Sequence, residues 1–143
     1  MLLLDVNVVV AAHRDDHVHY AQVNEWFEDV LAGMEPFAVP TLVWTSFLRL
    51  VTSRRVFNPP TRLEDAFAFI DAVCGQPHHL PVGPGIHHMT ILRTLCEEVN
   101  AAGDLIPDAA LAAIALEHDC KVASLDRDFA RFSLVDRVVP GRT

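Results

Sequence analysis

The chain has 143 residues, of which 51% are hydrophobic, and 19 acidic against 11 basic side chains give a net charge of −8. This length predicts a single domain, residues 1–143, that is large enough to bury a hydrophobic core. The apolar content excludes a disordered chain, and the acidic charge disfavours general nucleic-acid binding unless arginines or a bound cation offset it locally.

The chain begins with Met1-Leu-Leu-Leu-Asp5, which lacks the basic region of a signal peptide. Its longest apolar runs are far shorter than the roughly 20 residues that cross a membrane. We therefore expect a cytoplasmic protein with no membrane association. Cys74, Cys96 and Cys120 are far apart and form no CxxC pair, so we expect buried free thiols and neither disulfides nor a zinc site.

Short apolar segments alternate with helical patterns along the chain. The leucines at residues 2–4 suit the central strand of a parallel sheet that is covered on both faces. Further strands are predicted at residues 37–39, 79–82, 121–124 and 137–139. Helical spacing predicts helices at about 6–13, 17–32, 41–52, 62–74, 86–100 and 107–118, and a helical turn at 126–132. This alternation predicts an α/β fold with a small, mainly parallel sheet.

Local signals mark the ends of several helices. Gly33 follows one helix, Thr61-Arg-Leu-Glu64 is a capping-box pattern at the start of another, and Pro107 suits the first position of the last. The helix over Leu42–Val51 is apolar nearly all round, which indicates deep burial or contact with a second chain. Its apolar surface exceeds what one core face needs, so we predict an exposed patch there and a homodimer.

Acidic side chains follow two of the predicted strands and begin one late helix. Asp5 follows the first strand, Asp126 and then Asp128 follow the strand at 121–124, and Asp108 lies in the first turn of an otherwise apolar helix. Each acid alone is explained as a helix cap or as a complement to a helix dipole. In a parallel sheet, however, the carboxyl ends of the strands share one edge, where ligands and chemistry collect.

Carboxylates gathered at this edge would repel one another by about 4 kcal/mol per pair, at a separation of roughly 4 Å and an effective dielectric constant of about 20. They would therefore bind protons or a hard divalent cation, and Mg²⁺ and Mn²⁺ prefer oxygen ligands. Such an ion can activate water and stabilise the charge that develops on a phosphoryl group. Candidate contacts to RNA phosphates, or else members of a solvated basic surface, are Arg14, Arg49, Arg54 and Arg55.

Three segments carry a family resemblance: MLLLDVNVVVAAHR at the start, VPTLVWTSFLRLVTSRRVF in the middle and LIPDAALAAIALEHDCKVASLDRDFARF near the end. They resemble the PIN-domain ribonucleases, in particular the VapC-type toxins of bacterial toxin–antitoxin pairs. The segments frame nearly the whole chain, and the last one is the most specific. The resemblance implies a PIN-like three-layer α/β/α sandwich, often a homodimer, that cuts RNA with Mg²⁺ or Mn²⁺.

By position, the resemblance also implies roles for individual residues. The implied catalytic residues are Asp5, Asp108 and Asp126, the implied metal ligands are these three with Asp128, and the small polar residues that support the pocket are Asn7 and Ser124. A VapB-type antitoxin is the implied partner, which typically inserts a segment near the acidic pocket and blocks it.

One feature departs from the family pattern. Many relatives carry a glutamate in the helix after the second strand, but here no acid lies between Glu35 and Glu64, and the nearest equivalents are Ser46 and Phe47. This departure leaves an alternative function, a catalytically degenerate PIN-fold module that only binds a partner protein. A phosphatase with an aspartate nucleophile is disfavoured, because Asn7 stands where such enzymes need a second aspartate.

Overall fold

The computed structural model describes residues 1–142 of the chain. Its strands are β1 (Leu2–Leu4), β2 (Phe37–Ala38), β3 (Lys121–Ala123) and β4 (Arg137–Val138). Its helices are α1 (Val6–His13), α2 (Tyr20–Ala32), α3 (Thr41–Val51), α4 (Leu63–Cys74), α5 (His88–Val99) and α6 (Leu105–Glu117), with a short 3₁₀ helix, η1 (Arg127–Arg131), after β3.

The strands form one parallel sheet in the order β2-β1-β3-β4. Strand β1 is central, because Leu3 pairs with Ala38 on one side and with Val122 on the other. Leu3 and Leu4 are both 0% exposed, as expected for a strand that is covered on both faces. The predicted α/β class with a small parallel sheet is confirmed, and the carboxyl ends of β1 and β3 lie side by side.

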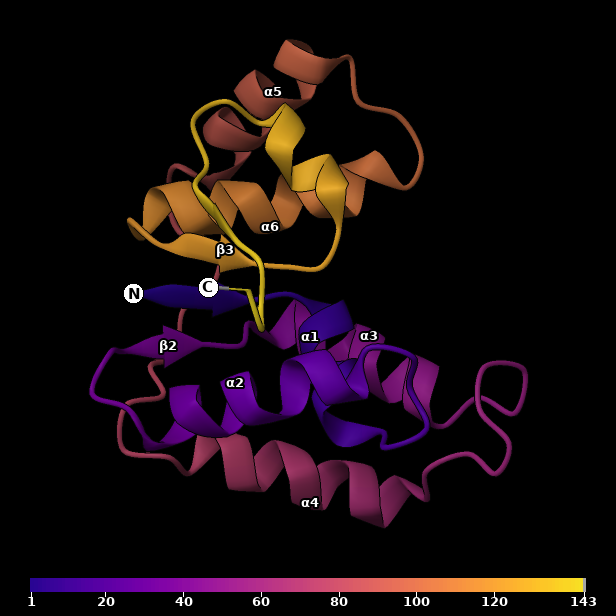
Figure 1. Cartoon of the computed structure of the whole chain (residues 1–143). Helices are drawn as coiled ribbons and strands as arrows, with labels where there is room; N and C mark the ends of the chain where they lie inside the picture. Colours follow the sequence, from indigo (N-terminus) through magenta and orange to yellow (C-terminus); the bar gives the residue numbers. More distant parts are fainter. Residues whose placement is uncertain (143) are drawn as a thin grey trace.

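Helices cover both faces of this sheet, which confirms the predicted three-layer sandwich. In Figure 1, α5 and α6 lie above the strands, α2 and α4 lie below them, and α1 and α3 lie to the right of β2. Helix α6 packs against both α5 and β3, and residues 111–115 of this helix are all buried. Its many alanines allow this close approach, because a methyl side chain leaves little volume between a helix and its neighbours. The position of the first turn of α6 is thereby fixed relative to the sheet.

One predicted strand and one predicted cap are not formed. Residues 79–82 make only an isolated parallel bridge, between His79 and Phe37, because prolines that lack an N–H donor flank it. The Thr61 side chain does not cap α4, which has no side-chain cap hydrogen bond. Its hydroxyl contacts His13 and Arg14 instead, so the capping-box prediction is wrong.

Three helices begin at other residues than predicted. Helices α2 and α5 begin at Tyr20 and His88, because turns occupy the residues before them. Helix α6 begins at Leu105, which places Pro107 at the third helical position and not at the first. A proline is accommodated there, because the first N–H groups of a helix have no partner within the helix.

The apolar helix α3 is packed inside the protein and presents no exposed apolar patch. Trp44, Phe47 and Val51 are buried, and none of the apolar side chains in residues 41–51 is exposed. Helices α1 and α4 pack against it, and the ring of Phe47 stacks on that of Phe69 at a centroid distance of 5.3 Å. The predicted patch on α3 is therefore wrong, and the homodimer stays a prediction that this helix does not support.

Two other expectations concern the membrane and the cysteines. Within residues 1–142, no helix is both long enough and apolar enough to span a membrane. The cysteines are free, as predicted, but only Cys120 is buried, and Cys74 is exposed. The prediction of buried thiols is wrong for Cys74, because it lies at the exposed end of α4.

Candidate active site

The carboxyl ends of β1 and β3 bring predicted site residues to one edge of the sheet. Leu4 pairs with Ala123 in parallel register, and the backbone N–H of Asp5 donates to the Ala123 carbonyl at 3.0 Å. Asp5 therefore leaves β1 beside the point where the chain leaves β3 toward Asp126. Asp108 approaches the same edge from the first turn of α6.

A hydrogen-bond network fixes the Asp5 carboxylate. Ser124 Oγ donates to Asp5 Oδ2 at 2.7 Å, and Asn7 Nδ2 donates to the same oxygen at 3.1 Å. The other oxygen, Oδ1, accepts from the Val6 N–H at 2.7 Å and so caps α1. Asn7 Oδ1 also accepts from the Leu125 N–H at 3.0 Å. Asn7 and Ser124 therefore orient Asp5 and tie the ends of the two strands together.

Three further carboxylates form a compact group, which we call the acidic cluster. One oxygen from each of Asp108, Asp126 and Asp128 lies within 4.8 Å of the others. Asp126 Oδ1 accepts from the Asp128 N–H at 2.9 Å, and the Asp126 N–H donates to Ser124 Oγ at 2.9 Å. Asp126 thus caps η1 and belongs to the cluster at the same time, so the two explanations of this acid do not exclude each other. Asp5 is not a member of the cluster but lies beside it.

The electrostatic field of this edge is strongly negative. Burial and the charges of Asp126, Asp5 and Asp128 raise the pKa of Asp108 to about 7. Burial also raises the pKa of Asp5, although the hydrogen bond from Ser124 opposes the shift. In the part of the chain that the structure describes, no basic side chain forms an ion pair with any of these four acids. Protonation or a bound cation would therefore relieve their mutual repulsion.

The donor set fits a hard divalent cation. Carboxylate oxygens are the preferred ligands of Mg²⁺ and Mn²⁺, and waters complete their coordination. Asp108, Asp126 and Asp128 offer three such oxygens within reach of one ion. Helix α3 adds no carboxylate, because its sequence contains no acid. At the two nearest equivalent positions, Phe47 is buried in the core and Ser46 carries a half-buried hydroxyl. The structure thus contains a three-carboxylate site, without the glutamate that the family pattern places in this helix.

One acid near the cluster was not among the predicted site residues. Asp104, the exposed residue that precedes α6, adds to the negative field that raises the pKa of Asp108. The sequence did contain a signal, since Asp104 stands four residues before Asp108, about one helical turn. It was missed because the helix was predicted to begin only at Pro107.

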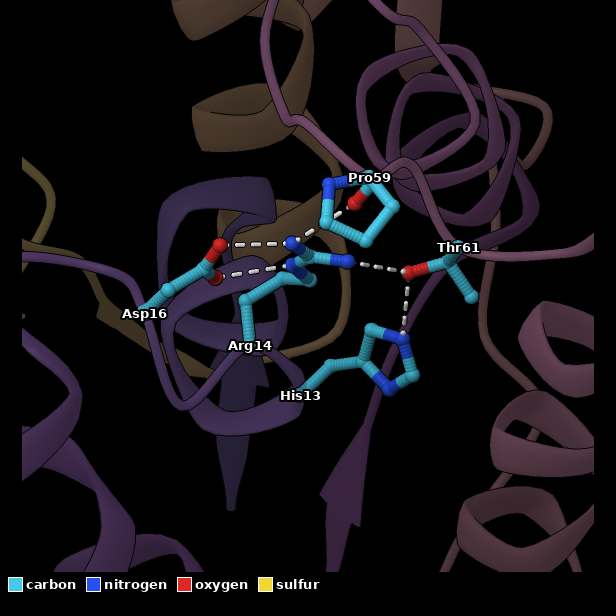
Figure 2. Close-up of polar contacts among 5 residues, drawn as sticks. All are labelled: His13, Arg14, Asp16, Pro59 and Thr61. Carbon is cyan, nitrogen blue, oxygen red and sulfur yellow. Dashed lines mark hydrogen bonds and ion pairs between the residues drawn. The ribbon is translucent and has the colours of Figure 1, made fainter.

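The four arginines predicted to bind RNA fall into two groups. Arg49, Arg54 and Arg55 are exposed, and among the described residues they form no ion pair. The side chain of Arg14 is only 13% exposed. Figure 2 shows that it is directed toward three neighbours, to which it donates hydrogen bonds: Asp16, Pro59 and Thr61. Arg14 therefore has a structural role that the sequence did not reveal.

Comparison with known proteins agrees with this architecture. The PIN-domain family profile matches residues 2–134, and the chain belongs to the PIN-domain family. It is similar to Ribonuclease VapC25 and Ribonuclease VapC31 of Mycobacterium tuberculosis, at 59% and 58% identity over 140 residues, which cover 98% of this chain and 99% of each relative. The structure of VapBC2 from Rickettsia felis, bound to a DNA fragment from its promoter, has the same fold, with a TM-score of 0.69 and 14% identity over 96% of both chains.

Proposed function

We propose that this protein is a metal-dependent endoribonuclease that acts as the toxin of a toxin–antitoxin pair. The observation that carries the proposal is the acidic cluster, in which three carboxylates converge within 4.8 Å and none is paired with a basic side chain of the described residues. Relatives that are 59% and 58% identical over nearly the whole chain are named ribonucleases, which supports the choice of RNA as substrate.

In this proposal the acids at the edge of the sheet hold the metal ion together. Asp108, Asp126 and Asp128 would hold a Mg²⁺ or Mn²⁺ ion, and Asp5, which Ser124 and Asn7 hold in place beside them, would be the further ligand. The bound ion would activate a water and stabilise negative charge on the scissile phosphate. Ser124 holds Asp5 and Asp126 through one hydroxyl, so it couples the strand ends that carry these two acids.

The proposed partners are RNA, a VapB-type antitoxin and a second copy of the chain. Solved structures with the same fold include VapBC pairs, such as that of Rickettsia felis, and this supports an antitoxin as partner. The charge of the acidic edge supports an antitoxin segment that supplies basic residues to it, because opposite charges across an interface favour association. The homodimer rests on the family resemblance alone.

The proposal predicts that RNA cleavage requires both the metal and Asp126. Asp126→Asn removes one charge but keeps an oxygen that can accept from the Asp128 N–H, so the η1 cap survives. We expect at least a hundredfold lower cleavage rate, the size of loss typical for a group that stabilises the transition state. The matched control is Asp136→Asn, the same change at an exposed side chain before β4, which should cleave as the wild type does.

The measurement is gel or fluorescence analysis of single-stranded RNA, with Mg²⁺, with Mn²⁺ and with a chelator. Cleavage that survives the chelator, or an Asp126→Asn variant as active as the control, would exclude this mechanism. A candidate antitoxin, encoded by the gene next to this one, serves as the binding partner. Tight binding to it without any metal-dependent cleavage would instead favour the alternative function, a catalytically degenerate module that only binds a partner protein.

A further inference from the structure

The segment that joins α3 to α4 concentrates positive charge in an otherwise acidic protein. Residues 49–62 contain four arginines and no acid, whereas the whole chain has a net charge of −8. We call residues 52–61 the arginine arm; it carries Arg54 and Arg55, both of which are exposed. In Figure 1 the arm projects to the right, on the side toward which the strand arrows point. Asp5 and Asp126 follow β1 and β3 at this end of the strands.

The arm is a closed loop. The Thr61 N–H donates to the Val51 carbonyl at 2.7 Å, which joins the two ends of the arm. Within it, the N–H groups of Val56 and Phe57 donate to the Ser53 carbonyl at 3.1 and 3.0 Å and form a tight turn. Residues 54 and 55 lie within this turn, so their backbone positions are set by hydrogen bonds of the arm itself.

Arg14, which follows α1, fastens the arm to the body of the protein (Figure 2). Its guanidinium lies over the ring of Phe57, 4.5 Å from the ring centre. Nη2 donates to the Pro59 carbonyl at 3.0 Å, and Nη1 donates to Thr61 Oγ1 at 3.2 Å. Asp16 holds the same guanidinium through two hydrogen bonds of 2.9 and 2.6 Å. One side chain thus contacts three residues of the arm and is itself fixed.

The Thr61 hydroxyl links this arginine to the core. It accepts from Arg14, so its own proton can be donated to His13 Nε2, which lies 3.0 Å away. The His13 ring in turn packs against Phe47 and Phe69, at centroid distances of 5.3 and 4.7 Å. We call His13, Arg14, Asp16 and Thr61 the Arg14 clamp. The clamp residues also line an open cleft of about 720 Å³.

We propose that the arginine arm binds the phosphates of the single-stranded RNA substrate through Arg54 and Arg55, and that the Arg14 clamp positions the arm for this contact. The inference rests on the proposed function, since it takes the bound RNA to be the RNA that is cut. Arg14 is then a positioning residue and not an RNA ligand.

Physical reasons favour RNA over an acidic protein as the ligand of the arm. Two adjacent exposed arginines that form no ion pair with a carboxylate of residues 1–142 suit a chain of phosphates, each of which an arginine can hold by two parallel hydrogen bonds. The edge of the sheet that carries the acidic cluster repels the RNA phosphates, so a separate cationic contact is needed to hold the substrate there. A fixed arm lowers the conformational entropy that binding must remove, which is the benefit of the clamp.

Three variants and a matched control test the proposal. Arg54→Gln/Arg55→Gln removes both charges of the arm, and Arg93→Gln/Arg142→Gln removes two charges from exposed sites elsewhere. Thr61→Val removes the clamp hydroxyl while keeping the side-chain shape, and Thr61→Ser keeps the hydroxyl. Binding of a fluorescent single-stranded RNA oligonucleotide is measured in chelator, at several salt concentrations, so that no cleavage interferes.

We expect the Kd of Arg54→Gln/Arg55→Gln to rise about tenfold, and the slope of log K against log salt to fall by about 1, as for the loss of one to two phosphate contacts. Thr61→Val should raise the Kd about threefold with the slope unchanged, because the charges remain but the arm is less ordered. Thr61→Ser and the Arg93→Gln/Arg142→Gln control should bind as the wild type does. In cleavage assays the KM should rise with kcat unchanged, since the arm does not touch the reacting atoms.

The proposal is overturned if the arm variant binds RNA as tightly as the Arg93→Gln/Arg142→Gln control does. It is also overturned if the arm variant keeps RNA binding but loses binding to the protein of the neighbouring gene, which would make the arm a protein-docking surface. A Thr61→Val variant with unchanged Kd would remove the clamp from the proposal. Because binding is measured without metal, loss of the proposed nuclease function and loss of arm binding are separate results.

Discussion

The acidic edge, which carries Asp5 and the acidic cluster, brings like charges together, whereas the Arg14 clamp pairs opposite charges. At the edge, the sheet topology brings Asp5 beside three further carboxylates, and burial with like charges raises the pKa of Asp108 to about 7. In the clamp, Arg14 donates hydrogen bonds to the Asp16 carboxylate and the Thr61 hydroxyl. It also donates to the Pro59 carbonyl of the arm. Its pairing with Asp16 raises the pKa of Arg14 and lowers that of Asp16, so both groups are stabilised in their charged forms.

The two arrangements of charge indicate different roles: the acidic edge is suited to binding a ligand, and the Arg14 clamp is suited to stabilising the fold. A group of like charges costs folding free energy and is useful only when a ligand compensates it, which is why perturbed pKa values cluster at functional sites. A satisfied charge contributes to folding and presents nothing to a ligand. Substitutions in the two regions should therefore change the free energy of unfolding with opposite signs in the metal-free protein.

The largest change in stability is expected in the clamp. Arg14→Leu removes four hydrogen bonds and the contact with Phe57, and we expect the free energy of unfolding to fall by about 2 kcal/mol. Urea denaturation measures the change. Arg54→Leu is the matched control, and it should stay within about 0.5 kcal/mol of the wild type because Arg54 is exposed. Equal effects of the two substitutions would show that the clamp does not stabilise the fold.

Much of the fold and of the acidic edge could be predicted from local sequence patterns. The apolar run at residues 2–4 and its alternation with helical segments indicated a parallel sheet, and the rule that chemistry collects at carboxyl edges placed Asp5 and Asp126 together. The absence of a glutamate from α3 could also be predicted, because the sequence contains no acid between Glu35 and Glu64.

The clamp could not be predicted, because its parts are brought together by packing. Arg14 and Thr61 are 47 residues apart, and nothing in either segment indicates that they meet. The Thr61–Glu64 pattern suggested a local cap, but the tertiary contact with Arg14 and His13 takes the hydroxyl away from the helix. Deep burial of α3, one of the two alternatives that its apolar sequence indicated, is confirmed. The exposed patch was predicted wrongly for the same reason as the cap, since α1 and α4 cover the apolar side that the sequence left unassigned.

A smaller change of opposite sign is expected at the acidic edge. In metal-free protein at pH 8, Asp108→Asn removes a charge that burial and four neighbouring acids disfavour. We expect the free energy of unfolding to rise by about 1 kcal/mol, well below the full value of the pKa shift, because Asp108 is partly exposed and water screens its charge. Urea denaturation in chelator measures the gain.

Manganese should then reverse the order of stability of the two proteins. An ion held by the acidic cluster would stabilise the folded wild type, whereas the Asp108→Asn variant would lack one ligand and should gain less. Asp136→Asn, the same change at an exposed aspartate before β4, is the control for the amide substitution. An Asp108→Asn variant that is less stable than the wild type in chelator would mean that Asp108 serves the fold as a helix-dipole partner and not as a member of a repelling cluster.

The smallest expected effect is the pH dependence that His13 gives to the clamp. Burial and the adjacent charge of Arg14 lower the pKa of His13 from its ordinary value of 6.5, while Asp65 opposes the shift. The unfolded chain therefore takes up this proton at a higher pH than the folded protein does. As the pH falls from about 7 through 6.5 toward the lowered pKa, His13 should reduce the free energy of unfolding. His13→Gln removes this titration, so its stability should fall less over the same range. The other titrating groups are present in both proteins and cancel in the difference between the two denaturation series. Parallel curves would show that the protonation of His13 is not linked to folding.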